Sequence, residues 1–388
     1  MVCPLFFIRV IMKRLTAWII VSALIATFII LTLYNHPLKK QDENLLYSKG
    51  VVTNVDNDDI TTVGISSIGF QLVDVLLTEG DHKGKSVTAK NDLLGQLDVD
   101  EVYRKGDNIV LVMHVMDDII HESKTLNRNR QGNESLLFGI FLALLLIYAG
   151  FTGLKAMFSF VASLFILWRF LIPALLRGED PLLYTIITLT LLTVVIIYSV
   201  AGFNRKALAA VLGTLTGLAI AISLTLIFGE RMMLFGHTAP FASTLLFSGY
   251  IGLDMRGIFY AAVIIGASGA AMDIAMDVSA AMYEVKEQSP DIPAGQLIKS
   301  GLNVGRTVVG TMTTTLLLAY SGGYLTMLML FVAKNSSFIR ILNMKMVAAE
   351  IFRTLVGSIG LVMVAPVTAV IAGWLFTTVF AKSSKKQG

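Results

Sequence analysis

Long apolar runs separated by short polar connections dominate this sequence. Most runs have the length of about 20 residues that a helix needs to cross the hydrocarbon core of a bilayer. The pattern therefore predicts a polytopic α-helical membrane protein with about eight transmembrane helices. These predicted spans are Leu15–Tyr34, Ser135–Gly153, Ala156–Leu176, Leu182–Ala201, Leu208–Phe228, Gly257–Val285, Val308–Val332 and Val347–Phe380.

Between the first two predicted spans, the periodicity becomes strand-like. Apolar residues alternate or cluster at Val51–Thr53, Thr61–Ile65, Gln71–Leu77 and Asn108–Val115, with turn signals between them. About five short strands in this length predict one small β-rich, OB-like domain on the extracytoplasmic side. The polar segment His121–Glu134 has no periodicity, and we interpret it as a linker back to the membrane.

These patterns divide the chain into four parts. Residues 1–34 form the N-terminus and first transmembrane helix, and 35–134 form the β-rich domain and linker. Residues 135–380 form a transmembrane domain of about seven helices, and 381–388 form a basic tail. The apolar segment Phe241–Leu253 is too short to span, so we expect it to be re-entrant or interfacial.

Composition and charge agree with this organisation. The chain is 55% hydrophobic and 15% charged, whereas soluble domains contain about 25% charged residues. Basic residues in the short connections place both termini in the cytoplasm of a bacterial plasma membrane, although Lys334, Arg340 and Lys345 oppose this orientation. A cleavable signal peptide is the alternative for the first span, and Met12 is an alternative start. The one cysteine, Cys3, excludes a disulfide framework within one chain.

One predicted span carries two carboxylates among small residues. Asp273 and Asp277 are four residues apart, so they lie on one helix face. The same face carries Gly266, Ala270, Ala280 and Glu284. An ionised Asp at membrane depth costs about 2.5–3.5 kcal/mol on insertion scales and normally faces a bundle interior or a water-filled path. Two adjacent carboxylates in such a place are unfavourable when both are ionised, which suits a proton relay or a cation site. The alternative for Asp277 and Glu284 is hydration near the cytoplasmic surface.

Further polar candidates lie in the next two spans. Arg306 follows Asn303, and Thr311 and Thr314 extend a polar surface suited to close helix contact or a hydrogen-bonded path. We expect Arg306 to pair with Asp273 or Asp277. The alternatives are ordinary anchoring by Arg306 at the cytoplasmic surface and simple packing by the threonines.

In the last span, Glu350 and Arg353 have the i,i+3 spacing of a salt bridge. They are interpreted as a gate or path entrance, or as a hydrated pair at the outer rim. The histidines are scattered without metal-ligand spacing, and nucleotide-binding and hydrolase motifs are absent from the sequence. We therefore expect no enzyme activity, no metal, no cofactor and no nucleic-acid partner.

Several sequence blocks resemble the YibE/F family of bacterial multi-span membrane proteins, over about Gln71–Thr378. The blocks are Met272–Asp277, Ser300–Arg306, Gly310–Thr313 and Ala349–Gly360. The resemblance implies a membrane protein without a defined biochemical role. Asp277 departs from the family pattern, where small or hydroxyl residues are usual, and this weakens the case for a second carboxylate. A more distant likeness, through Asp273 and Arg306–Thr315, to the SecD/SecF and resistance–nodulation–division group implies proton-coupled work.

The expected function is that of a secondary, ion-gradient-coupled transporter or export factor. Asp273 would be the titrating group, and Asp277 and Arg306 would tune its pKa. The outer domain would handle or gate the substrate. The alternative is a non-transporting membrane scaffold or sensor whose outer domain binds a partner. Expected partners are the lipid bilayer, a small-molecule or protein substrate, and a second copy or another membrane protein. The sequence names no substrate, coupling ion, direction of transport or oligomeric state.

Overall fold

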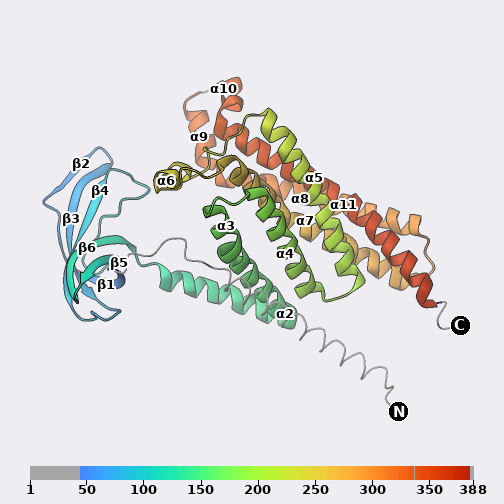
Figure 1. Cartoon of the computed structure of the whole chain (residues 1–388), viewed down its shortest axis with the longest axis horizontal. Coiled ribbons are helices and arrows are strands. Elements are labelled where there is room, and N and C mark those ends of the chain that lie inside the picture. Colours follow the sequence, from blue (N-terminus) through green and yellow to red (C-terminus); the bar gives the residue numbers. More distant parts are fainter. Residues whose placement is uncertain (1–43, 336, 385–388) are drawn as a thin grey trace, which may run out of the picture. The chain divides into compact units, whose positions relative to one another are not determined.

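The computed structural model describes residues 44–335 and 337–384. These residues divide into two compact units, with the boundary between Tyr148 and Ala149 (Figure 1). The boundary lies inside a long helix and not at the predicted position between residues 134 and 135. The first predicted span, Leu15–Tyr34, and the last residues of the basic tail lie outside the described residues.

The first unit is a β-barrel-like domain. Its strands are β1 (Leu45–Asp56), β2 (Ile60–Val63), β3 (Ser66–Leu77), β4 (Ser86–Leu94), β5 (Asn108–Met116) and β6 (Ile119–Arg128). The sheet order is β1-β5-β6-β4-β3-β2, and β1 also pairs with β3, which closes the barrel (Figure 1). A register shift between Val52 and Asn54 bends β1 so that it serves both partners. The prediction of a small β-rich domain is therefore confirmed.

The interpretation of His121–Glu134 as a linker is wrong. Most of this segment belongs to β6, which pairs antiparallel with β5 along its length and parallel with β4 at Lys90 and Lys124. Ser123 is the one buried residue of β6. The strand is held by backbone hydrogen bonds and shows no apolar alternation, so periodicity could not reveal it.

A polar network lies inside the barrel. Gln71 is fully buried, and its side chain accepts a hydrogen bond from the Tyr103 amide (3.0 Å) and donates to the Tyr103 carbonyl (2.8 Å). Asn91 donates to Gln71 (3.2 Å) and accepts from Thr125 (2.9 Å). Because these buried polar groups are paired, the network positions the 101–104 segment across the barrel.

Two arginines at the end of the last strand and just after it are held by barrel carboxylates. Arg128 forms a bidentate pair with Asp107 (2.9 Å for each bond), and Arg130 pairs with Glu101. Partial burial of Glu101 by itself raises its pKa, but the hydrogen bonds and charges of Arg130 and Arg128 outweigh burial and lower the pKa below its ordinary value. These contacts fix the end of the barrel where the chain continues into a helix.

The remaining elements are helices. They are α2 (Gln131–Ile166), the π-helical η1 (Leu167–Leu171), α3 (Ile172–Leu176), α4 (Pro181–Ala201), α5 (Arg205–Arg231), α6 (Ala242–Phe247), α7 (Met255–Gln288), α8 (Ala294–Gly323), α9 (Leu325–Ala333), α10 (Phe338–Asn343) and α11 (Lys345–Ser384). In the described part of the chain, five helical segments are long and apolar enough to cross a membrane, or up to six if α8 and α9 form one bent span.

The predicted number of about eight spans is therefore not confirmed. The second and third predicted spans lie in one helical segment, Gln131–Leu176, which is interrupted at the non-helical Gly150. The predicted span Val308–Val332 is divided between α8 and α9, which are bent by 66°. The predicted spans that match α4, α5, α7 and α11 are long apolar helices as expected.

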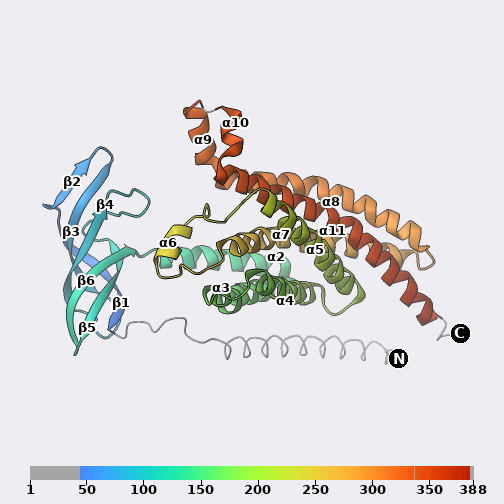
Figure 2. The same cartoon turned by 45° about the horizontal axis from the view of Figure 1, so that its top comes forward.

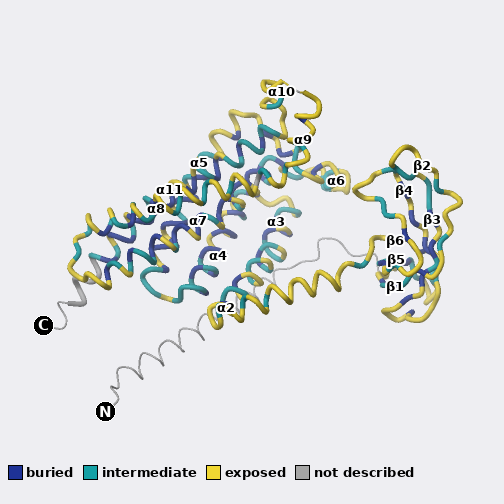
Figure 3. The backbone as a smooth tube through the Cα atoms, turned by 180° about the vertical axis from the view of Figure 1, so that it is seen from behind, coloured by how far each residue is buried: buried dark blue, intermediate teal, exposed yellow. Residues whose placement is uncertain are grey.

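The second unit is packed around α5, α7, α8 and α11, which lie side by side (Figure 2). Buried positions concentrate along α4, α5, α7 and α11, whereas much of α2 is exposed (Figure 3). Glycines permit the close approach of α5 and α11: a Cβ atom at Gly217 would lie 2.2 Å from Cγ2 of Val364, and one at Gly213 would overlap Thr368. Small residues at such contacts are the usual basis of helix association in membranes.

Candidate functional site in the membrane-spanning helices

The face of α7 that carries the two aspartates is exposed at both carboxylates and partly covered at Ala270 and Ala280. Asp273 and Asp277 are both exposed. None of the other residues of this face is buried: Gly266, Ala270, Ala280 and Glu284. The opposite face is buried, and there Ser279 donates a hydrogen bond of 2.6 Å to the Lys206 carbonyl of α5. The helix therefore presents its carboxylates away from the packed core.

The acidic residues of this face lie at different positions along α7. Asp273 lies near the middle of α7, among apolar neighbours in sequence, whereas Glu284 lies one turn from its end at Gln288. No ion pair within the described residues joins Asp273 or Asp277 to a basic side chain. A carboxylate in an apolar helix without a countercharge requires water, a proton, a cation or another chain for its stabilisation.

Arg306 does not pair with either aspartate. Its guanidinium donates to Oδ1 of Asn303 at 3.2 Å, one turn earlier in α8. It lines a shallow groove of about 220 Å³ between α8 and α11, together with Gly305, Val309 and Pro366. Within the described residues, Arg306 lies beside α11, and the expected pairing with Asp273 or Asp277 is not formed.

The hydroxyl groups of α8 bond mostly within their own helix. Thr311 donates to the Val308 carbonyl at 2.9 Å, and Thr313 donates to the Val309 carbonyl at 2.8 Å. Thr311 and Thr314 are exposed on the α8 surface, as is Asn303. These contacts satisfy the Thr311 hydroxyl without a partner helix, so the packing interpretation and the path interpretation both remain open for it.

Glu350 and Arg353 do form the predicted salt bridge. Their closest atoms are 3.3 Å apart, and their side chains are 14% and 22% exposed. The Arg353 guanidinium also lies 5.8 Å from the centre of the Phe259 ring of α7. Oε1 of Glu350 and Nε of Arg353 are buried and have no hydrogen-bond partner among the described residues. The pair is thus enclosed between α7 and α11, and the interpretation as a fully hydrated surface pair does not hold.

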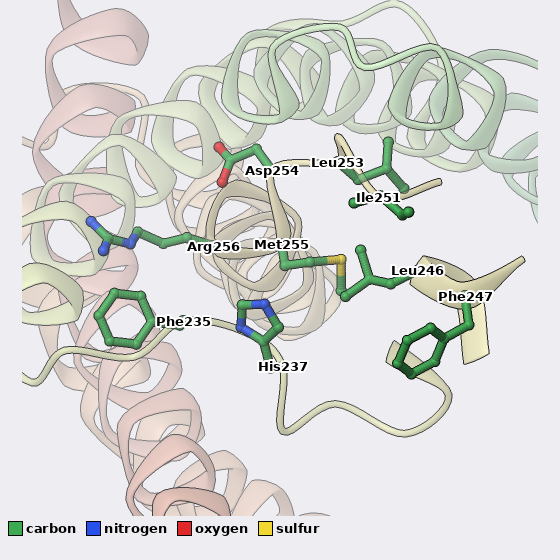
Figure 4. Close-up of a pocket in the computed structure, with 9 residues that line it drawn as sticks. All are labelled: Phe235, His237, Leu246, Phe247, Ile251, Leu253, Asp254, Met255 and Arg256. Atoms are coloured by element: carbon green, nitrogen blue, oxygen red, sulfur yellow. The ribbon is translucent and has the colours of Figure 1, made fainter. Parts of the chain in front are cut away.

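A cavity that the sequence did not reveal lies at the segment that connects α5 to α7. It has a volume of about 730 Å³, and Figure 4 shows its lining residues. They are Phe235, His237, Leu246, Phe247, Ile251, Leu253, Asp254, Met255 and Arg256. The short helix α6 forms one wall, so Phe241–Leu253 folds as a cap beside the start of α7 and is not among the helices long enough to cross a membrane.

The signals for this cavity in the sequence are weak. Gly236 is required where it packs on the backbone of Met255, because its φ is +75° and a Cβ atom there would lie 2.0 Å from the Met255 carbonyl oxygen. Asp254 caps α7 by accepting a hydrogen bond from the Gly257 amide at 3.0 Å. The cap fixes the start of α7, whereas the fold-back of the preceding loop depends on tertiary contacts.

Comparison with known proteins places the chain in a family. The YibE/F-like protein family matches residues 137–378, which is more than half of the chain and includes α7, α8 and most of α11. No curated protein and no solved structure matches the chain. The family match and the long apolar helices identify a membrane protein of undefined role. The chain belongs to the YibE/F-like family.

Proposed function

We propose that this protein is a secondary transporter or export factor coupled to an ion gradient, with Asp273 as the group that binds and releases the coupling ion. The supporting observation is the exposed carboxylate face of α7, a helix whose other sides pack against α4, α5, α8 and α11. Charged groups at membrane depth are costly, and in membrane proteins they commonly mark ion pathways.

The remaining polar groups have secondary roles in this proposal. Asp277, one turn from Asp273, disfavours simultaneous ionisation of both groups. Arg306 and Asn303 are hydrogen-bonded polar residues of α8, and Thr311 and Thr314 follow them toward the C-terminal end of the helix. The Glu350–Arg353 pair lies where α11 contacts α7, so a change in the packing of these helices would alter the hydrogen bonding of the pair.

The wider proposal concerns location and partners. The protein acts in a bacterial plasma membrane with both termini in the cytoplasm, so that the barrel lies outside. It is not an enzyme and needs no cofactor. Its partners are lipids, a small-molecule or protein substrate, and a second copy or another membrane protein. No nucleic acid takes part.

The test is a pH jump on membranes that contain the full-length protein. Proton binding by an intramembrane carboxylate moves charge, which a solid-supported membrane records as a transient current even without a known substrate. We expect Asp273→Asn to remove the protein-dependent current and Glu284→Gln, the matched control on the same face, to keep it. Equal currents from wild type and Asp273→Asn, at equal protein insertion, would contradict the proposal.

A scaffold or sensor is the second candidate, and one feature of the barrel favours it. Strands β4 and β6 are paired at one position, and beside it lies a groove of about 390 Å³ lined by Thr88, Lys90, His121 and Glu122 among others. A partner held there would be lost on deletion of Pro37–Arg130. Capture of a partner that is unaffected by this deletion would refute the scaffold function of the barrel.

A further inference from the structure

The cavity beside α6 separates polar from apolar lining residues. Figure 4 shows Arg256, Asp254 and His237 on one side, with the Phe235 ring among them, and Leu246, Phe247, Ile251 and Leu253 on the other. A volume of about 730 Å³ lies within the range of small-molecule sites, which are mostly apolar with a few polar groups. An occupant of matching chemistry has one polar end and one apolar end.

The polar end of this cavity favours an anion. The Arg256 guanidinium lies 4.7 Å from the centre of the Phe235 ring, which holds it at the cavity wall. No carboxylate among the described residues forms an ion pair with it. Asp254, the acidic residue of the lining, already accepts a hydrogen bond from the start of α7, where the helix dipole stabilises negative charge.

A second basic residue lies next to this polar end. A neighbouring cavity of about 280 Å³ shares Phe235 and His237 with the first one and is also lined by Lys345, the first residue of α11. Arg256 and Lys345 therefore flank the His237 region from two helices. Cations in two adjoining cavities attract an acidic head group more strongly than a neutral one.

The apolar end of the cavity is open to the surroundings of the helices. Phe247 is 87% exposed and Ile251 is 80% exposed. Both residues belong to the loop between the end of α5 at Arg231 and the start of α7 at Met255. Such helix ends mark the membrane interface, where exposed aromatic and aliphatic side chains contact lipid.

Backbone geometry indicates that this loop is held in a defined shape. Met233 and Phe241, neither of them glycine, have φ angles of 52° and 61°. Residues in this conformation persist when surrounding contacts impose it, and they occur often at ligand clamps. Contacts around these two residues therefore fix the path of the loop beside α6.

We infer that this cavity binds an anionic lipid, with the acidic head group at Arg256 and an acyl chain along Leu246, Phe247 and Ile251. The inference is independent of the proposed ion coupling, since it uses none of the α7 carboxylates. It assigns to α6 and its loop the role of a lipid-binding cap at the membrane interface.

The experiment uses the full-length protein, freed of lipid in detergent and titrated by native mass spectrometry. The probes are dioleoylphosphatidylglycerol, dioleoylphosphatidylcholine and inorganic phosphate. We expect saturable binding of the phosphatidylglycerol and weaker binding of the phosphatidylcholine. Arg256→Gln should weaken phosphatidylglycerol binding about fivefold to tenfold, the loss expected for one arginine at an acidic head group.

Matched variants make the result specific. Arg231→Gln removes a second arginine, stacked 5.8 Å from the Phe228 ring outside the cavity, and should leave binding unchanged. Ile251→Ser should weaken lipid binding, whereas Ile339→Ser, at a similarly exposed isoleucine of α10, should not. Equal effects of Arg256→Gln and Arg231→Gln, equal binding of both lipids, or full competition by inorganic phosphate would overturn the inference.

Discussion

The contact between α5 and α11 gives the most quantitative prediction. Gly217→Ala adds one methyl group to α5 where Cγ2 of Val364 would be 2.2 Å away and its Cα 3.2 Å away. Carbon atoms in favourable contact are about 3.5–4.0 Å apart. The new methyl group therefore overlaps Val364 by more than 1 Å, estimated from these distances.

Val364 has little freedom to relieve this overlap. It is fully buried, and a β-branched side chain in a helix has one strongly preferred rotamer. The helices must then separate, which also loosens the contacts of Gly213 with Thr368 and of Gly360 with Ala221. Overpacking of this kind costs about 1–3 kcal/mol, so we expect the free energy of unfolding to fall by about 2 kcal/mol.

The assay is reversible unfolding of the purified protein in mixed micelles, followed by circular dichroism as the fraction of denaturing detergent rises. Gly310→Ala is the matched control, because Gly310 lies in α8 with nothing within 4 Å of an added Cβ atom. The helix-propensity gain, about 1 kcal/mol or less, is common to both variants. If Gly217→Ala were as stable as Gly310→Ala, the close α5–α11 contact described above would be refuted.

Two further predictions concern the barrel, and urea unfolding of the soluble fragment 44–130 measures both. Gln71→Leu leaves the buried Tyr103 amide and carbonyl without partners, so the free energy of unfolding should fall by about 2–5 kcal/mol. Thr53→Ala, the control, removes an exposed hydrogen bond and should lower it by less than about 1 kcal/mol. Similar losses for the two variants would refute the network. Because Arg130 lowers the pKa of Glu101, the ionised carboxylate stabilises the folded barrel above the ordinary value of 4.5, and this stability is lost as the pH falls below it. Glu101→Gln should therefore destabilise the barrel at neutral pH and converge with wild type in acid, and a constant difference at all pH values would contradict the ion pair.

Sequence patterns predicted the elements whose stability is local. The apolar length of Pro181–Ala201 and Met255–Gln288, with side-chain caps at Asp180 and Asp254, defines α4 and α7. The helical spacing of Asp273 and Asp277 correctly placed them on one face, and the i,i+3 spacing correctly predicted the pair of Glu350 with Arg353.

Features that depend on distant contacts escaped prediction. Strand β6 is polar and is defined by its ladder with β5, so no apolar alternation marks it. The bend between α8 and α9 and the break at Gly150 interrupt apolar runs without a proline at the break. The cavity beside α6 brings together Phe235 and Arg256, which helical or strand periodicity does not connect.

The central claim is that Asp273 binds and releases a proton or cation within the membrane. Infrared difference spectroscopy of the purified full-length protein, recorded across a pH titration, tests it most directly by comparing wild type with Asp273→Asn and Asp277→Asn. The account predicts a protonated-carboxyl band that changes across the pH titration and is absent in Asp273→Asn. A spectrum without such a band, or a band that persists in Asp273→Asn, would contradict the account.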